Sequence, residues 1–158
     1  ARDDPSAVLN HINRHFEYLW DTSMFATAVY AVVGAGKRTL RLSCAGHPPP
    51  LLARGGEVSE IPVTATMLLL MTSLGTMPCV EHALQPGDRL VFFTDGITER
   101  HADDDTMYEV DRLKAALRRA ATLDPSAAVG HVVKDVEAFA AGHEPDDDQT
   151  LVLAAILG

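Results

Sequence analysis

The sequence predicts one α+β domain over residues 1–158, in which helices cover mostly antiparallel sheets. Two features lead to this prediction. Short segments rich in β-branched and aromatic residues follow one another through residues 24–94, and two helical segments and a last apolar segment come after them. The composition, with 47% hydrophobic and 22% charged residues, is typical of a globular domain with a hydrophobic core.

The first part of the chain predicts a helix and two strands. The helix starts at Asp4, an N-cap residue followed by proline, and its apolar spacing continues to Leu19. Residues 24–33 and 38–46 have the composition of strands, with a turn at 34–37 between them. Alternate residues of the second strand share one apolar face, which consists of Leu40, Leu42 and Cys44.

The middle of the chain predicts a hairpin and two more strands. Residues 51–54 and 57–61 flank a Gly-Gly pair, which is typical of a tight hairpin. Residues 79–84 and 89–94 indicate strands joined by a turn that contains proline and glycine. Residues 64–75 fit either a short buried helix or a loop across the core.

Two helices and a strand complete the predicted elements. Residues 110–120 and 124–139 have helical apolar spacing, and the second helix starts with the same Asp-Pro-Ser signal as the first. Residues 150–157 are strongly apolar and predict an interior strand. The apolar stripe of the second helix consists of Val129, Val132, Val133, Val136 and Phe139.

The acidic balance limits the partners that we expect. A formal charge of −9 and a pI of about 5.1 disfavour nucleic acid, since its phosphates carry the same sign. The apolar runs are too short for a membrane span, and no leader sequence opens the chain. Cys44 and Cys79 lack a metal-binding spacing and lie in apolar segments, which is typical of free core thiols. These features predict a soluble, reduced, cytoplasmic domain.

Aspartates at two strand ends are the candidates for chemistry. The apolar run Leu90–Phe93 stops just before Asp95-Gly96, and Asp147 and Asp148 closely precede the last apolar segment. Two helices separate these sites in the sequence, and such an excursion can bring two strands side by side in one sheet. The carboxylates of Asp95 and Asp147 would then meet at the end of that sheet.

A meeting of carboxylates favours a bound cation. Two unit charges about 4 Å apart repel by roughly 4 kcal/mol at an effective dielectric of 20. Mn²⁺ or Mg²⁺ reverses the sign of this interaction, and both ions prefer carboxylate oxygen and water. Such an ion lowers the pKa of bound water from ~15.7 towards ~7, which suits a phosphoryl hydrolase.

Simpler interpretations stay open for each motif. Asp-Gly alone is a common turn, and an acidic run before a strand is commonly a solvated loop, as we expect for residues 103–105. The Gly-Ala-Gly-Lys segment at 34–37 lacks the other residues of a phosphate-binding loop and indicates a hairpin turn. His47, between Gly46 and three prolines, is interpreted as a residue that shapes its loop.

Several motifs together resemble a known family. Three of them, AGHPPPLLAR, LQPGDRLVFFTDGITE and DDDQTLVL, resemble in that order the phosphatase domain of stage II sporulation protein E. This is a bacterial branch of the metal-dependent protein phosphatases of type 2C. The segments DPSAVLNHINRHF and FATAVYAVV are also similar to that branch, so the resemblance covers almost the whole chain.

The resemblance implies a fold and a reaction. The fold is an α/β/β/α sandwich of mostly antiparallel sheets, and the cofactors are a pair of Mn²⁺ or Mg²⁺ ions. The reaction is the hydrolysis of phosphoserine or phosphothreonine by metal-activated water, without a phosphoenzyme. By motif, Asp95 and Asp147 correspond to metal ligands, and Gly96 permits a close turn beneath the metals. The other supporting residues, none with an assigned catalytic role, are Asp148, Gly46 and His47.

The chain departs from the family at its start. Family members first carry a Gly-Asp-x-x-Asp-like and an Asp-x-x-Gly-His-Gly-like motif, and neither is present here, so we expect an N-terminally incomplete domain. A sheet without its first strands exposes an edge, which favours a homodimer.

Three functions stay open. The first is a serine/threonine phosphatase acting on a phosphorylated regulatory protein, by analogy an anti-sigma-factor antagonist. The second is a non-catalytic binding module with an incomplete metal site. The third, which we favour least, is a hydrolase of small phosphate esters.

Overall fold

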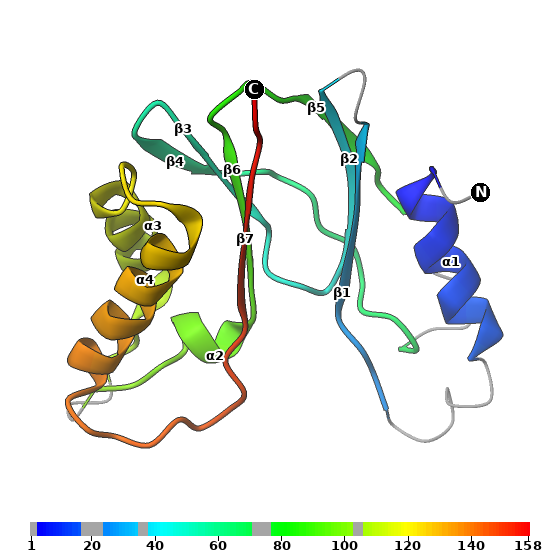
Figure 1. Ribbon diagram of the computed structural model, residues 1–158. Helices are drawn as coiled ribbons and strands as arrows, with labels where there is room; N and C mark the ends of the chain where they lie inside the picture. The colour runs from blue at the N-terminus through cyan, green and yellow to red at the C-terminus, as the bar shows by residue number, and fades with distance from the viewer. Residues whose placement is uncertain (1–2, 17–23, 35–37, 71–76, 103–105) are drawn as a thin grey trace. The chain divides into compact units, whose positions relative to one another are not determined.

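A computed structural model describes residues 3–16, 24–34, 38–70, 77–102 and 106–158. The chain divides into two compact units, the first made of residues 1–49 and 62–85 and the second of residues 50–61 and 86–158. Each unit contains an antiparallel sheet in contact with helix, as the predicted α+β class requires (Figure 1). Within the described residues, no helix is long and apolar enough to cross a membrane.

The first unit is a three-stranded sheet in contact with one helix. The helix α1 spans Pro5–His15, and the strands β1 (Ala28–Gly34), β2 (Thr39–Ala45) and β5 (Val80–Ala83) lie in the order β1-β2-β5. The predicted cap of α1 is confirmed, because the Oδ1 atom of Asp4 accepts hydrogen bonds from the backbone N–H groups of Ser6 and Ala7. Leu9 on α1 packs in a buried cluster with Ala45.

The structure partly answers the open question about residues 64–75. Residues 64–70 form no helix and pair with β-structure only at Leu68, through an isolated bridge to Ala26. The next residue, Leu69, donates its backbone N–H to Oδ1 of the buried Asn13 at 2.7 Å. The rest of that segment and three other expected features, namely Leu19, the turn at 35–37 and the acidic run 103–105, lie outside the described residues.

The second unit is a four-stranded antiparallel sheet with helices on one face (Figure 1). Its strands β3 (Leu51–Arg54), β4 (Glu57–Glu60), β6 (Arg89–Phe93) and β7 (Leu151–Ala155) lie in the order β4-β3-β6-β7. Its helices are α2 (Asp95–Thr98), α3 (Glu109–Arg119) and α4 (Pro125–Ala140). The predicted hairpin is confirmed as β3–β4, and both predicted helices are confirmed as α3 and α4.

The apolar faces of α3 and α4 build the core of the second unit. Leu113 and Leu117 on α3 and Val132 and Val136 on α4 are buried against the sheet. Val133 differs, because its side chain is 43% exposed. The predicted apolar stripe of α4 therefore includes a residue that the sheet does not cover.

Two expectations about single elements are wrong. The last apolar segment was expected inside the sheet, but β7 is the final strand in the sheet order and its Val152 is 51% exposed. Cys79 was expected in the core and is exposed, whereas Cys44 is buried; both thiols are free, as expected. Apolar composition reveals neither the number of neighbours of a strand nor which of its faces is covered. Val152 lies on the face of β7 opposite to Leu151 and Leu153, which pack on the core cluster, and Cys79 adjoins the terminal strand β5.

Candidate metal centre

Asp95 lies where β6 ends and the short helix α2 begins. Its side chain is exposed, and Oδ1 accepts the backbone N–H of Gly96 at 3.1 Å. Its backbone carbonyl accepts the N–H of Glu99 at 2.7 Å and the hydroxyl of Thr98 at 3.2 Å. The main chain at Asp95 is therefore fixed by a closed turn, while the carboxylate faces solvent.

The predicted pairing of the two aspartate-bearing strands is confirmed. β6 and β7 are antiparallel neighbours, with Phe93 opposite Leu151. The pairing continues past the strands, because Thr94 donates its N–H to the carbonyl of Thr150 at 3.1 Å and accepts the Thr150 N–H on Oγ1 at 2.9 Å. The same Oγ1 donates to the carbonyl of Asp148 at 3.1 Å. Thr94 thus ties the end of β6 to the chain that precedes β7.

Gly96 allows the two chain segments to touch. A Cβ atom at this position would lie 2.5 Å from the carbonyl oxygen of Asp148 and 3.3 Å from that of Asp147. Gln149 bridges the same contact, since its Nε2 donates to the carbonyl of Gly96 at 3.0 Å. The absence of a side chain at Gly96 therefore allows a direct contact with the main chain of the acidic segment.

The two candidate ligands each keep one free oxygen. Oδ1 of Asp147 accepts the N–H of Asp148 at 2.7 Å, in the same way as Oδ1 of Asp95 accepts its following N–H. In the described part of the chain, neither Oδ2 atom has a hydrogen-bond partner. Two exposed carboxylates with free oxygens fit a hard cation such as Mn²⁺ or Mg²⁺, which completes its shell with water. Among the described residues, no three His, Cys, Asp or Glu side chains form a metal-binding group.

A buried arginine holds the acidic loop from its other end. Arg100 is only 7% exposed, and its guanidinium donates to the backbone carbonyls of His143 and Glu144. One step further along the loop, Asp146 lies 3.3 Å from Nδ1 of His101. Arg100 thus connects the chain after α2 to the loop that leads to Asp147.

Sequence reasoning missed the residues that build this junction. Thr94, Gln149 and Arg100 stand within or beside the motifs already recognised, but each acts through backbone carbonyls or N–H groups. Such bonds depend on which strands pair, and they produce no residue pattern that can be recognised in the sequence. Only the position of Thr94, directly before the Asp-Gly pair, offered a signal.

Gly46 and His47 have structural contacts within the first unit. Gly46 has a positive φ of 61°, and a Cβ atom there would collide with the side chain of Met67. Nδ1 of His47 lies 3.2 Å from the hydroxyl of Thr27, and its carbonyl accepts the Cys44 thiol at 3.0 Å. These contacts agree with the interpretation of His47 as a loop-shaping residue. Burial also raises the pKa of the Cys44 thiol, so this group is a poor nucleophile.

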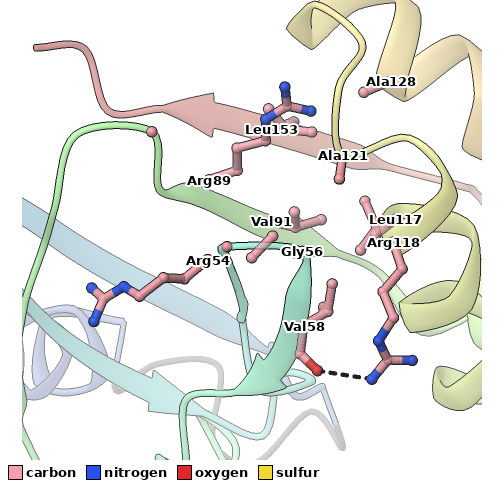
Figure 2. Close-up of a pocket in the computed structure, with 13 residues that line it drawn as sticks. Arg54, Gly56, Val58, Arg89, Val91, Leu117, Arg118, Ala121, Ala128 and Leu153 are labelled. Atoms are coloured by element: carbon pink, nitrogen blue, oxygen red, sulfur yellow. Dashed lines mark hydrogen bonds between the residues drawn. The ribbon is translucent and has the colours of Figure 1, made fainter.

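A small pocket elsewhere in the second unit is not a second centre (Figure 2). Its volume is about 50 Å³, far below that of ordinary ligand sites. Arginines surround it, but their donors are in use: Arg89 donates to the carbonyl of Ala120 at 3.1 Å, and Arg118 to that of Val58 at 3.4 Å. Arg54 points away from the pocket and pairs with Asp88.

The fold is that of a phosphatase of the PP2C class. The SiaA-PP2C domain of Pseudomonas aeruginosa superposes with a TM-score of 0.87 at 19% identity, covering 98% of this chain and 61% of that one. The manganese-soaked phosphatase domain of SpoIIE from Bacillus subtilis gives a TM-score of 0.65 at 20% identity, covering 83% of this chain and 56% of that one. These likenesses confirm the predicted fold class.

The sequence comparisons define the family. The profile of the family stage II sporulation protein E (SpoIIE) matches residues 1–157, so the chain belongs to this family, as the resemblance predicted. The phosphoserine phosphatase RsbU of Bacillus subtilis (strain 168) is 33% identical over 96 residues, which is 60% of this chain and 29% of RsbU. The chain thus spans less than a third of that curated relative.

Proposed function

We propose that the chain is the metal-binding part of a serine/threonine protein phosphatase. The observation that carries this proposal is the β6–β7 junction, where Thr94 and Gly96, the neighbours of Asp95 in the sequence, lie against the main chain of Asp147 and Asp148. Membership of the SpoIIE family supports it, as do matched relatives named as phosphatases.

In this proposal Asp95 and Asp147 hold Mn²⁺ or Mg²⁺ through their free carboxylate oxygens. The ion supplies Lewis-acid activation of water and of the phosphoryl group. The chain's own residues position these ligands: Thr94 and Gln149 lock the two segments together, and Gly96 leaves room for their contact. No side chain of the junction has to act as a nucleophile, which agrees with direct hydrolysis by water.

The proposed substrate is a phosphorylated regulatory protein. RsbU is named for phosphoserine, and this chain is similar to it over 96 residues. An anti-sigma-factor antagonist is the finer proposal for the substrate, and the cytoplasm is the proposed location. The two free thiols support a reducing compartment.

One observation favours a second function, a binding module without catalysis. Two carboxylates are fewer ligands than a two-metal hydrolase needs. Among the described residues, no group of three or more His, Cys, Asp or Glu side chains could hold a metal ion. In this alternative the junction binds a cation or a phosphoprotein without turning it over.

Turnover measurements separate these functions. Release of phosphate from a phosphoserine peptide and from an aryl phosphate would be measured with Mn²⁺, for the natural chain, Asp95→Asn and the control Asp111→Asn, whose residue is exposed on α3. We expect manganese-dependent turnover of the peptide that is lost in Asp95→Asn and kept in the control. Manganese binding without any turnover would establish the binding module, and preference for the aryl phosphate would establish a small-ester hydrolase.

A further inference from the structure

A groove lies between α3 and α4, which are in contact with each other in the second unit (Figure 1). Its volume is about 390 Å³. The short side chains of Ala115 on α3 and Ala138 on α4 line it, so the space between the two helices stays open there. The whole groove is formed by the continuous stretch 108–139, which belongs to one unit.

Arg112 differs from the other cations of α3. That helix has four cationic side chains, and three of them pair with carboxylates at 2.6, 3.8 and 2.5 Å, namely Lys114 with Glu60, Arg118 with Glu57 and Arg119 with Asp135. In the part of the chain that the structure describes, no carboxylate pairs with Arg112. Its guanidinium instead lies 4.7 Å from the centre of the Phe139 ring, which packs edge-on against Tyr108.

The guanidinium of Arg112 is positioned to bind an anion. Its contact with the ring of Phe139 uses no hydrogen-bond donor, so the N–H groups remain available, and a guanidinium binds a carboxylate through two parallel hydrogen bonds. The carboxylate that lines the groove, Asp135, is already occupied on both oxygens. It accepts the phenol of Tyr108 at 2.6 Å and the guanidinium of Arg119 at 2.5 Å.

The charge of the groove is opposite to that of the chain. Arg112 and Arg119 are positive and Asp135 is negative, so the lining has one positive charge in excess, whereas the formal charge of the chain is −9. An electropositive groove on an acidic protein attracts carboxylates and gives specificity against cationic segments.

The length of the groove fits a peptide. Its lining on the α3 side runs from Tyr108 to Arg119, which corresponds to about 16 Å at the rise of an α-helix. An extended chain covers this distance with about five residues. A single small anion would occupy only the surroundings of Arg112.

We propose that the groove between α3 and α4 is a docking site for an acidic, extended segment of a partner protein, with one carboxylate of that segment bound by Arg112. An apolar side chain of the segment packs over Ala115 and Ala138, where the groove is open. The inference does not depend on metal binding or on catalysis, because none of these residues belongs to the β6–β7 junction.

NMR titration of the isotope-labelled natural chain tests the proposal. The probe is a short peptide of alternating glutamate and leucine, and the control is the same peptide with lysine in place of glutamate. We expect the acidic peptide to shift the backbone resonances of Ala115 and Ala138, and the basic peptide to leave them unchanged. Added salt should weaken the binding, because it screens exposed charges.

Variants assign the binding to Arg112. Arg112→Gln should weaken it about tenfold or more, and Arg112→Lys should bind with intermediate affinity, since lysine keeps the charge but not the two parallel donors. Lys134→Gln is the matched control, because it removes the same charge from an exposed residue of α4 that does not line the groove. Ala138→Leu fills the groove and should weaken binding without any change of charge.

Three results would overturn the inference. The first is the absence of shifts at Ala115 and Ala138 with the acidic peptide at millimolar concentration. The second is equal binding of the basic peptide. The third is equal weakening in Lys134→Gln and Arg112→Gln, which would show a general attraction between charges. If Ala138→Leu fails to fold, the comparison of Arg112→Gln with Lys134→Gln still decides, because both positions are exposed.

Discussion

At the scale of single residues, the contact between Gly96 and the carbonyls of Asp147 and Asp148 determines how closely β6 and β7 approach beyond their last pair. The position is buried, and its missing Cβ is what allows a main-chain oxygen to lie within 2.5 Å of the place where that atom would stand. The candidate metal centre therefore requires glycine at position 96 as well as the carboxylates of Asp95 and Asp147.

Replacing Gly96 by alanine should separate the two segments. Because the methyl group meets main chain instead of a flexible side chain, we expect Gly96→Ala to lower the free energy of unfolding by about 1–3 kcal/mol, measured by urea denaturation. Gly130→Ala on α4 is the control, since a Cβ there meets nothing within 4 Å. The control should be neutral or more stable by about 0.5–1 kcal/mol. Equal behaviour of the two variants would contradict this account.

Thr94 should matter through its hydroxyl. The substitution Thr94→Val keeps the shape but removes the bonds to Thr150 and Asp148, which should cost about 1 kcal/mol of unfolding free energy and weaken Mn²⁺ binding. Thr94→Ser keeps the hydroxyl and should retain manganese affinity. Calorimetric titration of both variants checks this, and unaltered affinity in Thr94→Val would show that the hydroxyl does not position the ligands.

At the scale of elements, α3 and α4 are joined by a hydrogen-bonded carboxylate. Asp135 on α4 accepts the phenol of Tyr108 at 2.6 Å and the guanidinium of Arg119 at 2.5 Å. Burial alone would raise the pKa of Asp135, but these two bonds and the charge of Arg119 outweigh it, and the pKa lies below its ordinary value of 3.8. Arg112 adds a contact 4.7 Å above the ring of Phe139.

Acid should therefore loosen this helix pair. A lowered pKa means that the carboxylate of Asp135 stabilises the fold above its ordinary pKa, and that this stabilisation is lost as the pH falls through the folded-state value. We expect the unfolding free energy of the natural chain to drop in that acid range, and Asp135→Asn to show a smaller drop. Urea denaturation across pH measures both, and parallel pH profiles would exclude Asp135 as the source.

Elements differed in how far the sequence could predict them. The caps of α1 and α4 and the pairing of β6 with β7 followed from local signals, namely Asp-Pro starts and two apolar runs around a helical excursion. The sequence did not predict that β5 pairs with β2 or that β7 is a terminal strand of its sheet. Sheet order is decided by contacts between distant segments, and composition does not encode the number of neighbours of a strand.

At the scale of the whole molecule, the chain builds its two units from interleaved segments. The β3–β4 hairpin lies between the two sequence segments of the first unit but belongs to the second unit. There, Arg54 forms two hydrogen bonds with the carboxylate of Asp88, at 2.8 and 2.6 Å. Asp88 is 1% exposed, and its hydrogen bond raises the pKa of Arg54 above its ordinary value. This pair fixes the hairpin to the chain that leads into β6.

Breaking this pair should weaken the second unit strongly. Arg54→Met removes the cation that forms both bonds with the buried carboxylate of Asp88, so we expect a loss of about 3 kcal/mol in unfolding free energy. The double variant Arg54→Met/Asp88→Asn should recover part of this loss, because Asp88→Asn removes the buried negative charge. Chemical denaturation of both tests the prediction. A loss below about 0.5 kcal/mol in Arg54→Met would show that the pair is merely a surface contact.

The central claim is that Asp95 and Asp147 share one metal site, and calorimetric titration with Mn²⁺ tests it most directly. The natural chain, Asp95→Asn and Asp147→Asn would be compared, with Asp111→Asn as the control. We predict binding in the natural chain and the control, and affinity weaker by about tenfold or more in each strand-end variant. Undiminished binding in either strand-end variant, or no binding by the natural chain, would contradict a shared site.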